Sequence, residues 1–388
     1  MRIMNIAIIR RKFNPFGGAE QFILRATQGL KSKNIKMSII AESWVQQGEE
    51  TCLNNCEFIQ ASASGYSRTN KFNSFSNSVH QILKSKTFDL VQSHERISGV
   101  DIYRLGDGIH ASWVKRYSAE CSWLKKIWLK IDPYHRAVIR TEKAMAADQH
   151  LTFVANSTMV QKEIKDWYQV PDHRVVLIEN GIDTQQFQPV STSQRKKNKA
   201  NLGLNPDLPV VVFIGSGFAR KGAWELVNAV NTLANFQLLV IGHDKKLAAL
   251  QSYVNELQVS QYIHVLGPQH DVKKYLASAD IFCLPSSYDS FPNAALEAIC
   301  CGLPIIITDA VGLADRVRSE QAGVVCDKDA SSIAFAIEQC WKSLDLYSKN
   351  ALQLSKRYDI SIANEKWLNL YNQLLEAKKV KAIANSSH

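Results

Sequence analysis

The sequence predicts an α/β protein built from two doubly wound, Rossmann-like domains, each with a parallel sheet. Short apolar runs alternate with helical patterns along the chain, and strands separated by helices form parallel sheets covered on both faces. The alternation is interrupted at residues 191–201, STSQRKKNKAN, which are polar, basic and without apolar periodicity. With 388 residues, the chain is long enough for two domains of ordinary size.

The first predicted domain comprises residues 1–190. Its strands are expected in short apolar runs bounded by polar or turn-forming residues. These runs are residues 5–9, 36–40, 90–93, 102–105, 151–154 and 175–178.

The second predicted domain comprises residues 191–359 and repeats the same pattern. Its strands are expected at residues 210–214, 238–241, 263–266, 281–284, 305–308 and 324–326. Beyond it, residues 360–380 carry Trp367, Leu368, Tyr371 and Leu375 at helical spacing, which predicts an amphipathic helix.

Two glycines follow the first predicted strand, within residues 14–20, NPFGGAE. At Gly17 and Gly18, the missing Cβ lets backbone N–H groups approach a phosphate closely. A plain strand-to-helix turn is the alternative for such a pair. There is no G-x-G-x-x-G sequence here, so a dinucleotide cofactor has little support.

Two cations follow the strand predicted at residues 210–214, within GSGFARKG, residues 215–222. Arg220 can pair two phosphate oxygens in a fork, and Lys221 adds a point charge. Positive charge at the start of a helix is unfavourable unless an anion sits there. The flexible loop from Gly215 and this pair therefore indicate an anion site, against the alternative of a solvated pair.

Residues 288–304, YDSFPNAALEAICCGLP, form the most informative segment. A turn after a predicted strand leads into a helix, and Pro292 suits its first turn. Asp289 and Glu297 are separated by seven residues, so two carboxylates flank the start of the helix. Carboxylates can hold the hydroxyls of a polyol while the N–H groups between them face an anion, as a nucleotide-sugar requires.

These three motifs together resemble those of the family-4 retaining glycosyltransferases, which have the GT-B fold. Residues 288–304 resemble the E-x7-E element of that family, with Asp289 in the first Glu position. The glycine turn and the segment 215–222 resemble its other phosphate-binding elements, and the matches run in the expected order from about residue 5 to residue 330. The resemblance implies two domains facing a cleft, with the C-terminal helix packing back across both.

The resemblance also assigns roles in binding the donor. It implies that Glu297 accepts the ribose hydroxyls and that Asp289 faces the transferred sugar, where a side chain one methylene shorter than Glu alters the reach. Backbone groups at Phe291, Pro292, Asn293 and Ala294 are expected to complete the phosphate and sugar contacts. Backbone groups at Val265 and Leu266 are expected to recognise the base, and Gly242 and His243 are further candidates.

A third set of candidates follows the strand predicted at residues 102–105, in YRLGDGIH, residues 103–110. Within the family this run is most similar to enzymes that build the lipopolysaccharide core. His110 best matches the position near the reacting centre, Asp107 is second, and His94 is a third candidate that is more often structural. Retention needs no protein nucleophile, because the acceptor hydroxyl can attack from the leaving-group face.

No metal or other cofactor is expected. Arg220 and Lys221 can neutralise a leaving diphosphate, and no DxD-type cluster stands in a suitable place. The net charge of +10 implies an anionic partner. Nucleic acid is not favoured, because no aromatic-interleaved strand platform is evident.

Residues 113–140 suit an anionic membrane surface. They hold seven Lys or Arg against Glu120 and Asp132, a net charge of +5, together with three tryptophans. The alternative is a core helix with a solvated basic face. No apolar run approaches the roughly 20 residues of a membrane span, and a signal peptide is not expected.

The sequence thus predicts a cytoplasmic retaining hexosyltransferase, peripherally associated with the inner face of the cytoplasmic membrane. Its expected donor is UDP-glucose, and its expected acceptor is a glycolipid such as lipopolysaccharide inner core. The alternatives are another nucleotide-sugar, a capsule or exopolysaccharide acceptor, or a non-catalytic nucleotide-sugar-binding protein.

Overall fold

The computed structural model describes residues 3–13, 35–44, 56–119, 121–233 and 235–386. Gly17 and Gly18 lie outside these residues. The chain forms two compact units, Met1–Gly181 with Ile360–His388, and Ile182–Asp359. The units divide at Gly181 and Ile182 rather than at residues 190 and 191.

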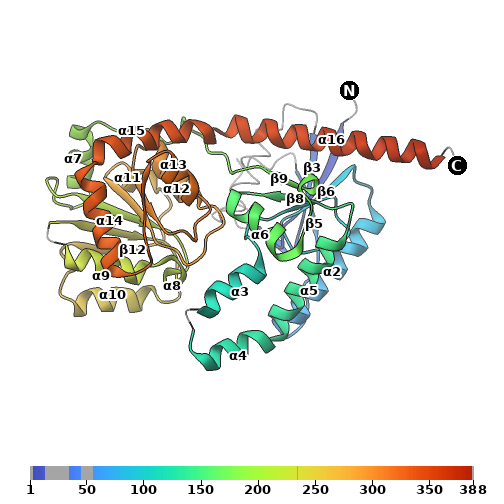
Figure 1. The fold of residues 1–388 in the computed structure, drawn as a ribbon, viewed down its shortest axis with the longest axis horizontal. Coiled ribbons are helices and arrows are strands. Elements are labelled where there is room, and N and C mark those ends of the chain that lie inside the picture. The colour runs from blue at the N-terminus through green and yellow to red at the C-terminus, as the bar shows by residue number, and fades with distance from the viewer. Residues whose placement is uncertain (1–2, 14–34, 45–55, 120, 234, 387–388) are drawn as a thin grey trace. The chain divides into compact units, whose positions relative to one another are not determined.

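The first unit contains a seven-stranded parallel sheet within its described residues (Figure 1). Its strands, in spatial order, are β5 (Cys56–Gln60), β3 (Ile35–Ala41), β1 (Met4–Ile9), β6 (Leu90–Ser93), β7 (Ile102–Arg104), β8 (Thr152–Ala155) and β9 (Val175–Leu177). The edge strand β5 was not predicted, because it is only partly buried and lacks an apolar run. A short parallel pair, β2 (Lys12–Phe13) and β4 (Ser43–Trp44), lies apart from this sheet.

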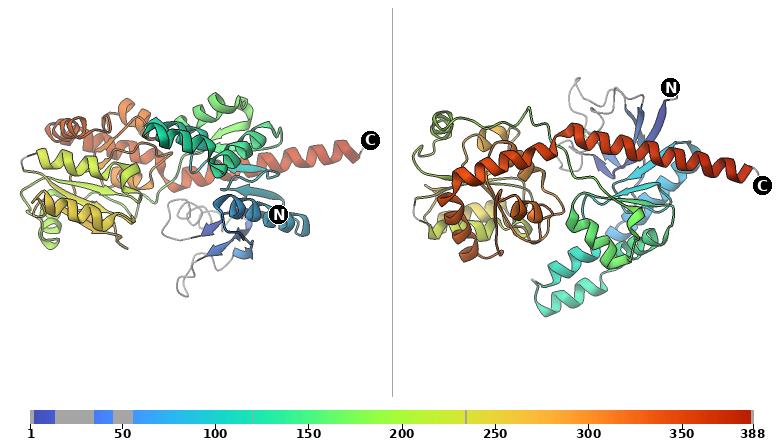
Figure 2. Two further views of the ribbon diagram at one scale, coloured as in Figure 1. Left: turned by 90° about the horizontal axis from the view of Figure 1, so that it is seen from below. Right: turned by 45° about the horizontal axis from the view of Figure 1, so that its top comes forward.

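Helices flank the first sheet. They are α2 (Arg68–Ser85), α3 (His110–Ala119), α4 (Trp123–Ile131), α5 (Pro133–Ala147), α6 (Thr158–Tyr168), the 3-10 helix η2 (Asp172–Arg174) and α16 (Ile360–Ser386). Helix α16 packs against this sheet through Trp367 and Tyr371, whose hydroxyl donates a hydrogen bond to Gln92 Oε1 at 2.7 Å. Figure 2 shows its C-terminal end extending past the sheet.

The second unit contains a six-stranded parallel sheet within its described residues. Its strands, in spatial order, are β12 (Ile263–Gly267), β11 (Gln237–Ile241), β10 (Val210–Ile214), β13 (Ile281–Leu284), β14 (Ile305–Ile307) and β15 (Gly323–Val325). Strands β10, β11, β13 and β14 are buried at every position, which explains why their sequences are apolar throughout except for Gln237 at the start of β11.

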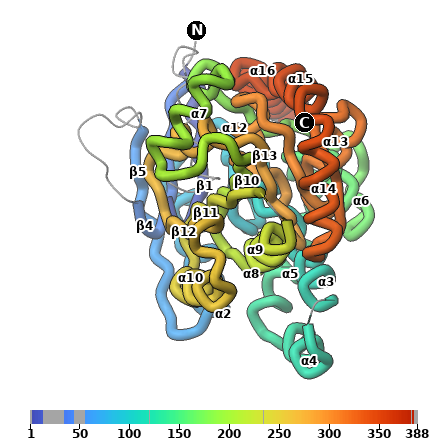
Figure 3. Tube along the Cα trace, turned by 90° about the vertical axis from the view of Figure 1, so that its left-hand side faces the viewer, coloured from blue at the N-terminus to red at the C-terminus, as the bar shows by residue number. Residues whose placement is uncertain are grey.

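Helices cover this second sheet as well. They are α7 (Thr192–Asn201), α8 (Phe218–Lys221), α9 (Ala223–Thr232), α10 (Leu247–Glu256), α11 (Lys273–Leu276), α12 (Asn293–Cys300), α13 (Ala314–Ser319), α14 (Ala330–Lys342), α15 (Leu344–Ser355) and the 3-10 helix η3 (Lys356–Tyr358). Helices α9 and α14 lie side by side in the second unit (Figure 3).

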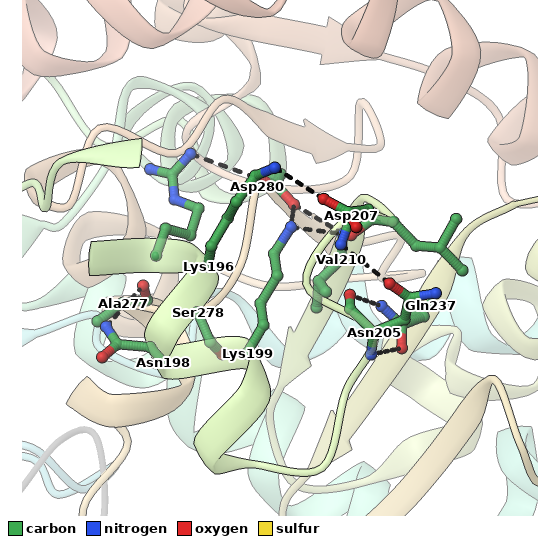
Figure 4. Close-up of polar contacts among 12 residues, drawn as sticks. Lys196, Asn198, Lys199, Asn205, Asp207, Val210, Gln237, Ala277, Ser278 and Asp280 are labelled. Carbon is green, nitrogen blue, oxygen red and sulfur yellow. Dashed lines mark hydrogen bonds and ion pairs between the residues drawn. The ribbon is translucent and has the colours of Figure 1, made fainter. Parts of the chain in front are cut away.

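Residues 192–201, within the segment where the alternation of strands and helices is interrupted, form helix α7. Ser191 caps the helix by accepting a hydrogen bond from Gln194 N at 3.2 Å. The helix is held to the sheet by charge instead of apolar packing. Lys199 Nζ lies 2.7 Å from Asp280 Oδ2, and Arg195 Nη1 lies 3.3 Å from Asp280 Oδ1 (Figure 4). A helix anchored by a buried lysine carries no apolar periodicity.

Removal of the Asp280 charge should destabilise the second unit. The Lys199 and Asp280 side chains are each 6% exposed, so an Asp280→Asn variant leaves a buried ammonium without its anion. Breaking a buried pair in this way costs about 3–5 kcal/mol. Urea denaturation measures the loss. Asp207→Asn, which removes the exposed partner of Lys196 on the same helix, is the matched control and should leave the midpoint unchanged. Equal midpoints for both variants would refute the anchoring role of Asp280.

Candidate functional site

Helix α8 presents Arg220 and Lys221 at the carboxyl end of β10. This single turn begins after Gly217 (φ 84°) and ends before Gly222 (φ 78°), both in the left-handed region that favours glycine. The Lys221 side chain folds back over Gly215, where a Cβ would lie only 2.7 Å from Lys221 Cδ. The glycines therefore let the turn close tightly and bring the lysine back over the strand end.

The loop after β13 presents Asp289 at the carboxyl end of the neighbouring strand. Its backbone is fixed by the turn that follows β14, since Asp289 N donates to Ala310 O at 3.0 Å and Gly312 N donates to Asp289 O at 2.8 Å. Helix α12 follows, with Pro292 at its N-cap and not in its first turn as the sequence predicted.

The structure brings Arg220, Lys221 and Asp289 together. Lys221 Nζ lies 3.1 Å from Asp289 Oδ2, and the two side chains are 14% and 12% exposed. Arg220 Nη1 lies 4.0 Å from the same oxygen and donates a hydrogen bond to Tyr288 O at 2.6 Å. Strands β10 and β13 are neighbours, so the loops at their carboxyl ends meet. The cluster can bind an anion through its two cations, and its one carboxylate can accept a hydrogen bond from a hydroxyl group.

The other predicted donor residues surround α12. Glu297 is half-buried in this helix, and Asn293 and Ala294 are half-buried in its first turn. Phe291 is buried and packs edge-on against Tyr358 at 5.7 Å between ring centroids, so its side chain serves the core. The roles expected for these residues in binding a donor remain predictions.

The predicted base-binding backbone lies at the end of β12. Val265 O accepts a hydrogen bond from Gln251 Nε2 at 2.9 Å, and Leu266 O accepts one from Gln269 Nε2 at 3.2 Å. Leu266 is the extra residue of a bulge opposite β11, which displaces the backbone locally. A base that reads this backbone would therefore meet carbonyl groups already engaged by glutamine side chains. No local sequence pattern pointed to either glutamine.

In the first unit, the predicted catalytic loop runs from β7 into α3. A Cβ at Gly106 would lie 2.3 Å from Arg104 Nη1, so a side chain there would displace the Arg104 guanidinium. Asp107 is exposed, and its Oδ2 lies 3.7 Å from Arg10 Nη1. His110 was expected in the loop, but it is the first residue of α3.

Glu142 on α5 is a polar residue that sequence reasoning missed. It is buried, and its Oε1 accepts hydrogen bonds from His110 N at 2.7 Å and from Arg96 Nε at 2.8 Å. Its Oε2 accepts one from the Tyr168 hydroxyl at 2.9 Å. A carboxylate at the first N–H groups of α3 complements the positive end of that helix. No local pattern could reveal it, because the contact joins residues 32 positions apart.

His110 is held in an aromatic cluster. Its ring stacks on Trp113 at 5.6 Å between centroids, and its Nε2 lies 2.9 Å from His135 Nδ1. Burial, with a further contribution from the Arg96 charge, lowers the pKa of His110 to about 3. The imidazole is therefore neutral at physiological pH and is suited to hydrogen bonding.

His94 is buried in the first unit and contacts a neighbouring side chain of the sheet. Its Nε2 lies 2.9 Å from Gln92 Nε2, while the Oε1 of the same Gln92 amide accepts the hydrogen bond from the Tyr371 hydroxyl. Burial, together with the charges of Arg104 and Arg10, holds the pKa of His94 well below its usual range. Gln92 thus joins β6 to Tyr371 of α16, and its amide also contacts His94.

Helix α4 exposes nearly all of its surface. The basic segment at 113–140 is divided among α3, α4 and α5. Asp132 ends α4 and caps the start of α5, whose first residue is Pro133. Trp113 belongs to the His110 cluster, but Trp123 and Trp128 on α4 are 68% and 51% exposed. Figure 2 shows α4 projecting from the first sheet. None of the helices in the described part of the chain is long and apolar enough to cross a membrane.

Two family models match the chain. The model described as "Glycosyl transferases group 1" matches residues 194–352, which include the cluster of Arg220, Lys221 and Asp289. The model described as "Glycosyltransferase Family 4" matches residues 16–186. The chain belongs to the group 1 and family 4 glycosyltransferases. The resemblance predicted from the sequence motifs is confirmed.

Individual relatives agree with this assignment. The glycosyltransferase is 23% identical to the lipopolysaccharide glucosyltransferase WaaG of Escherichia coli K12, over 83% of this chain and 85% of WaaG. A crystal structure of WaaG superposes with a TM-score of 0.79 at 20% identity, covering 94% of this chain and 99% of that one. A structure of Anabaena HepE in complex with UDP and glucose gives 0.74 at 17% identity, covering 95% and 100%. The predicted GT-B fold is confirmed.

The low pKa of His110 makes stability depend on pH. In the unfolded chain the pKa of an imidazole is near 6.5. Below that pH, His110 is therefore protonated in the unfolded state but stays neutral in the folded state. Stability should therefore fall as the pH decreases from about 6.5 toward the folded value of about 3. Urea denaturation at about pH 7 and about pH 5 should show this loss, and a His110→Gln variant should lose less. An unchanged dependence in that variant would contradict the shift at His110.

Proposed function

We propose that this glycosyltransferase moves glucose from UDP-glucose, with retention, onto a membrane glycolipid such as lipopolysaccharide inner core. The observation that carries the donor part is the cluster of Arg220, Lys221 and Asp289, in which two cations and one carboxylate converge at the ends of adjacent strands. HepE, which shares the fold, is described in complex with UDP and glucose, and this supports the choice of donor.

The cluster suits the departure of a nucleoside diphosphate. In the proposed reaction, the bond from the anomeric carbon to the phosphate oxygen breaks and the acceptor hydroxyl oxygen forms the new bond on the same face. The departing phosphate takes the hydroxyl proton. Arg220 and Lys221 stabilise the charge that develops on the diphosphate, and Asp289 accepts a sugar hydroxyl. Because two cations serve the leaving group, we propose that no metal is required. Loss of transfer in EDTA would contradict that part.

Helix α4 supports a membrane-bound acceptor. At 3.6 residues per turn, five exposed apolar residues fall on one face, opposite the buried Leu129: Trp123, Leu124, Ile127, Trp128 and Ile131. Lys125, Lys126 and Lys130 are exposed on the flanks of this face. An apolar face bordered by lysines and directed away from the buried Leu129 fits the plane of an anionic membrane. The name of WaaG, a lipopolysaccharide glucosyltransferase, supports the same class of acceptor. We further propose that the protein acts at the inner face of the cytoplasmic membrane.

Loss of the Lys221 charge should impair transfer. A Lys221→Met variant removes one cation from the leaving group and should lower kcat by about a hundredfold. Transfer from UDP-glucose to purified inner-core glycolipid, or hydrolysis of the donor alone, measures it. Lys342→Met removes an exposed lysine from α14 and is the control. Folded Lys221→Met protein with normal turnover would refute the cluster's role. No turnover of any nucleotide-sugar by the unsubstituted protein would favour the non-catalytic alternative.

Membrane binding should depend on α4. Each lysine near an anionic surface contributes about 1 kcal/mol, screened by salt. The protein should therefore sediment with phosphatidylglycerol vesicles at low salt and be released at high salt. Reversal of Lys125, Lys126 and Lys130 to glutamate should abolish sedimentation and leave UDP binding intact.

A charge-matched control separates α4 from net charge. Reversal of Lys342, Lys349 and Lys366, which are exposed on other helices, changes the total charge equally and should preserve sedimentation. Equal loss in both triple variants would mean that net charge alone attracts the protein to the vesicles. In that case α4 would not be the anchor.

A further inference from the structure

Helix α8 is too short to be stable on its own. It contains a single turn. Isolated helices this short are unstable, because the conformational entropy lost in forming the first turn exceeds the free energy gained from its hydrogen bonds. Glycines flank it on both sides and add conformational freedom in the unfolded state. Yet this turn carries Arg220 and Lys221, whose positions decide whether both cations face one ligand. Other parts of the second unit must therefore fix it.

The two ends of α8 are fixed by opposite charges. At the N-terminal end, Asp244 Oδ2 accepts a hydrogen bond from Phe218 N at 2.7 Å. At the C-terminal end, Lys328 Nζ donates one to Ala219 O at 3.1 Å. A carboxylate at the start of a helix and an ammonium at its end both complement the helix dipole.

Lys328 also reaches the loop that carries Asp289. Its Nζ donates to Ser287 Oγ at 2.7 Å, and Ser287 N in turn donates to Arg220 O at 2.8 Å. The Lys328 side chain is 16% exposed, so water competes little for these bonds. One ammonium group, placed by the segment between β15 and α14, therefore joins both loops of the cluster.

We propose that Lys328 is a positioning residue for the donor site, holding Arg220 and Lys221 in register with Asp289. The inference rests on the proposed function and names the residue that sets the geometry of its site. Lys328 acts through the backbone of α8 and the side chain of Ser287. The competing explanation is a purely structural ion pair, since Lys328 Nζ also lies 3.4 Å from Glu225 Oε1 on α9.

Two substitutions distinguish these explanations. Lys328→Met removes the contacts to α8, Ser287 and Glu225, while Glu225→Gln removes only the ion pair and keeps the bonds to the two loops. If Lys328 positions the cluster, Lys328→Met should weaken UDP binding by calorimetry and lower kcat/KM by about ten- to a hundredfold. Glu225→Gln should leave both within about twofold, and Lys328→Arg should restore part of the loss because it keeps a donor and the charge. Equal losses in Lys328→Met and Glu225→Gln would overturn the proposal.

A double substitution tests whether Lys328 acts through the cluster. In a Lys221→Met background, adding Lys328→Met should weaken UDP binding much less than it does alone, because residues that act as a unit are not additive. Full additivity would overturn the proposal. Lys342→Met serves again as the control for removing a lysine elsewhere in the second unit.

Hydrogen exchange gives a readout that needs no ligand. The Lys221 N–H is bonded to Gly217 O at 3.0 Å, so loosening of α8 should speed amide exchange across residues 215–222 in Lys328→Met. Unchanged exchange there would overturn the tie between Lys328 and α8. If the unsubstituted protein binds no UDP, the proposed function fails and the positioning role fails with it, whatever the exchange shows. If it binds UDP and Lys328→Met binds equally well, only the positioning role fails.

Discussion

The register of β10 against β13 is the constraint on which the donor site depends, and Asp280 sets it at the amino ends of both strands. Asp280 N donates to Val210 O at 2.8 Å, and its Oδ2 accepts from Val210 N at 2.8 Å and from Lys199 Nζ at 2.7 Å. Parallel strands that start in register also finish in register. The loops at their carboxyl ends therefore meet, and Lys221 reaches Asp289.

The cluster at those carboxyl ends shows how a binding site is built from segments that are individually weak. A one-turn helix, a glycine-rich loop and the loop before α12 have little stability of their own. Each is held by polar contacts from a neighbour: Asp244 and Lys328 at α8, and Ala310 and Gly312 at Asp289. The ion pair of Lys221 and Asp289 keeps both charges compensated while no donor is bound. In the proposed function a donor exchanges that contact for its own phosphate and hydroxyl groups.

The first unit combines two unlike environments. Around His110, burial and Arg96 hold an imidazole neutral, and Glu142 compensates the N–H groups at the start of α3. On α4, apolar side chains that would ordinarily be buried lie exposed beside lysines. In the proposed membrane-bound state, burial of Trp123 and Trp128 would contribute hydrophobic free energy that these side chains do not contribute to folding. The packing of α3, α4 and α5 joins these two environments within one unit.

The sequence by itself determined the two parallel sheets, the family and the segments proposed to bind the donor, because buried strands and glycine-rich turns are encoded by neighbouring residues. It placed Arg220 and Lys221 after β10, Asp289 in the turn after β13, and Glu297 in the helix that follows that turn. Only the tertiary structure showed α7 as a helix, Glu142 at the start of α3, and Lys328 between α8 and Ser287. Each of these depends on a polar contact between residues far apart in the chain. Such a contact leaves no periodicity in the sequence. A single buried charge needs only one polar partner, and that partner can come from any segment of the fold.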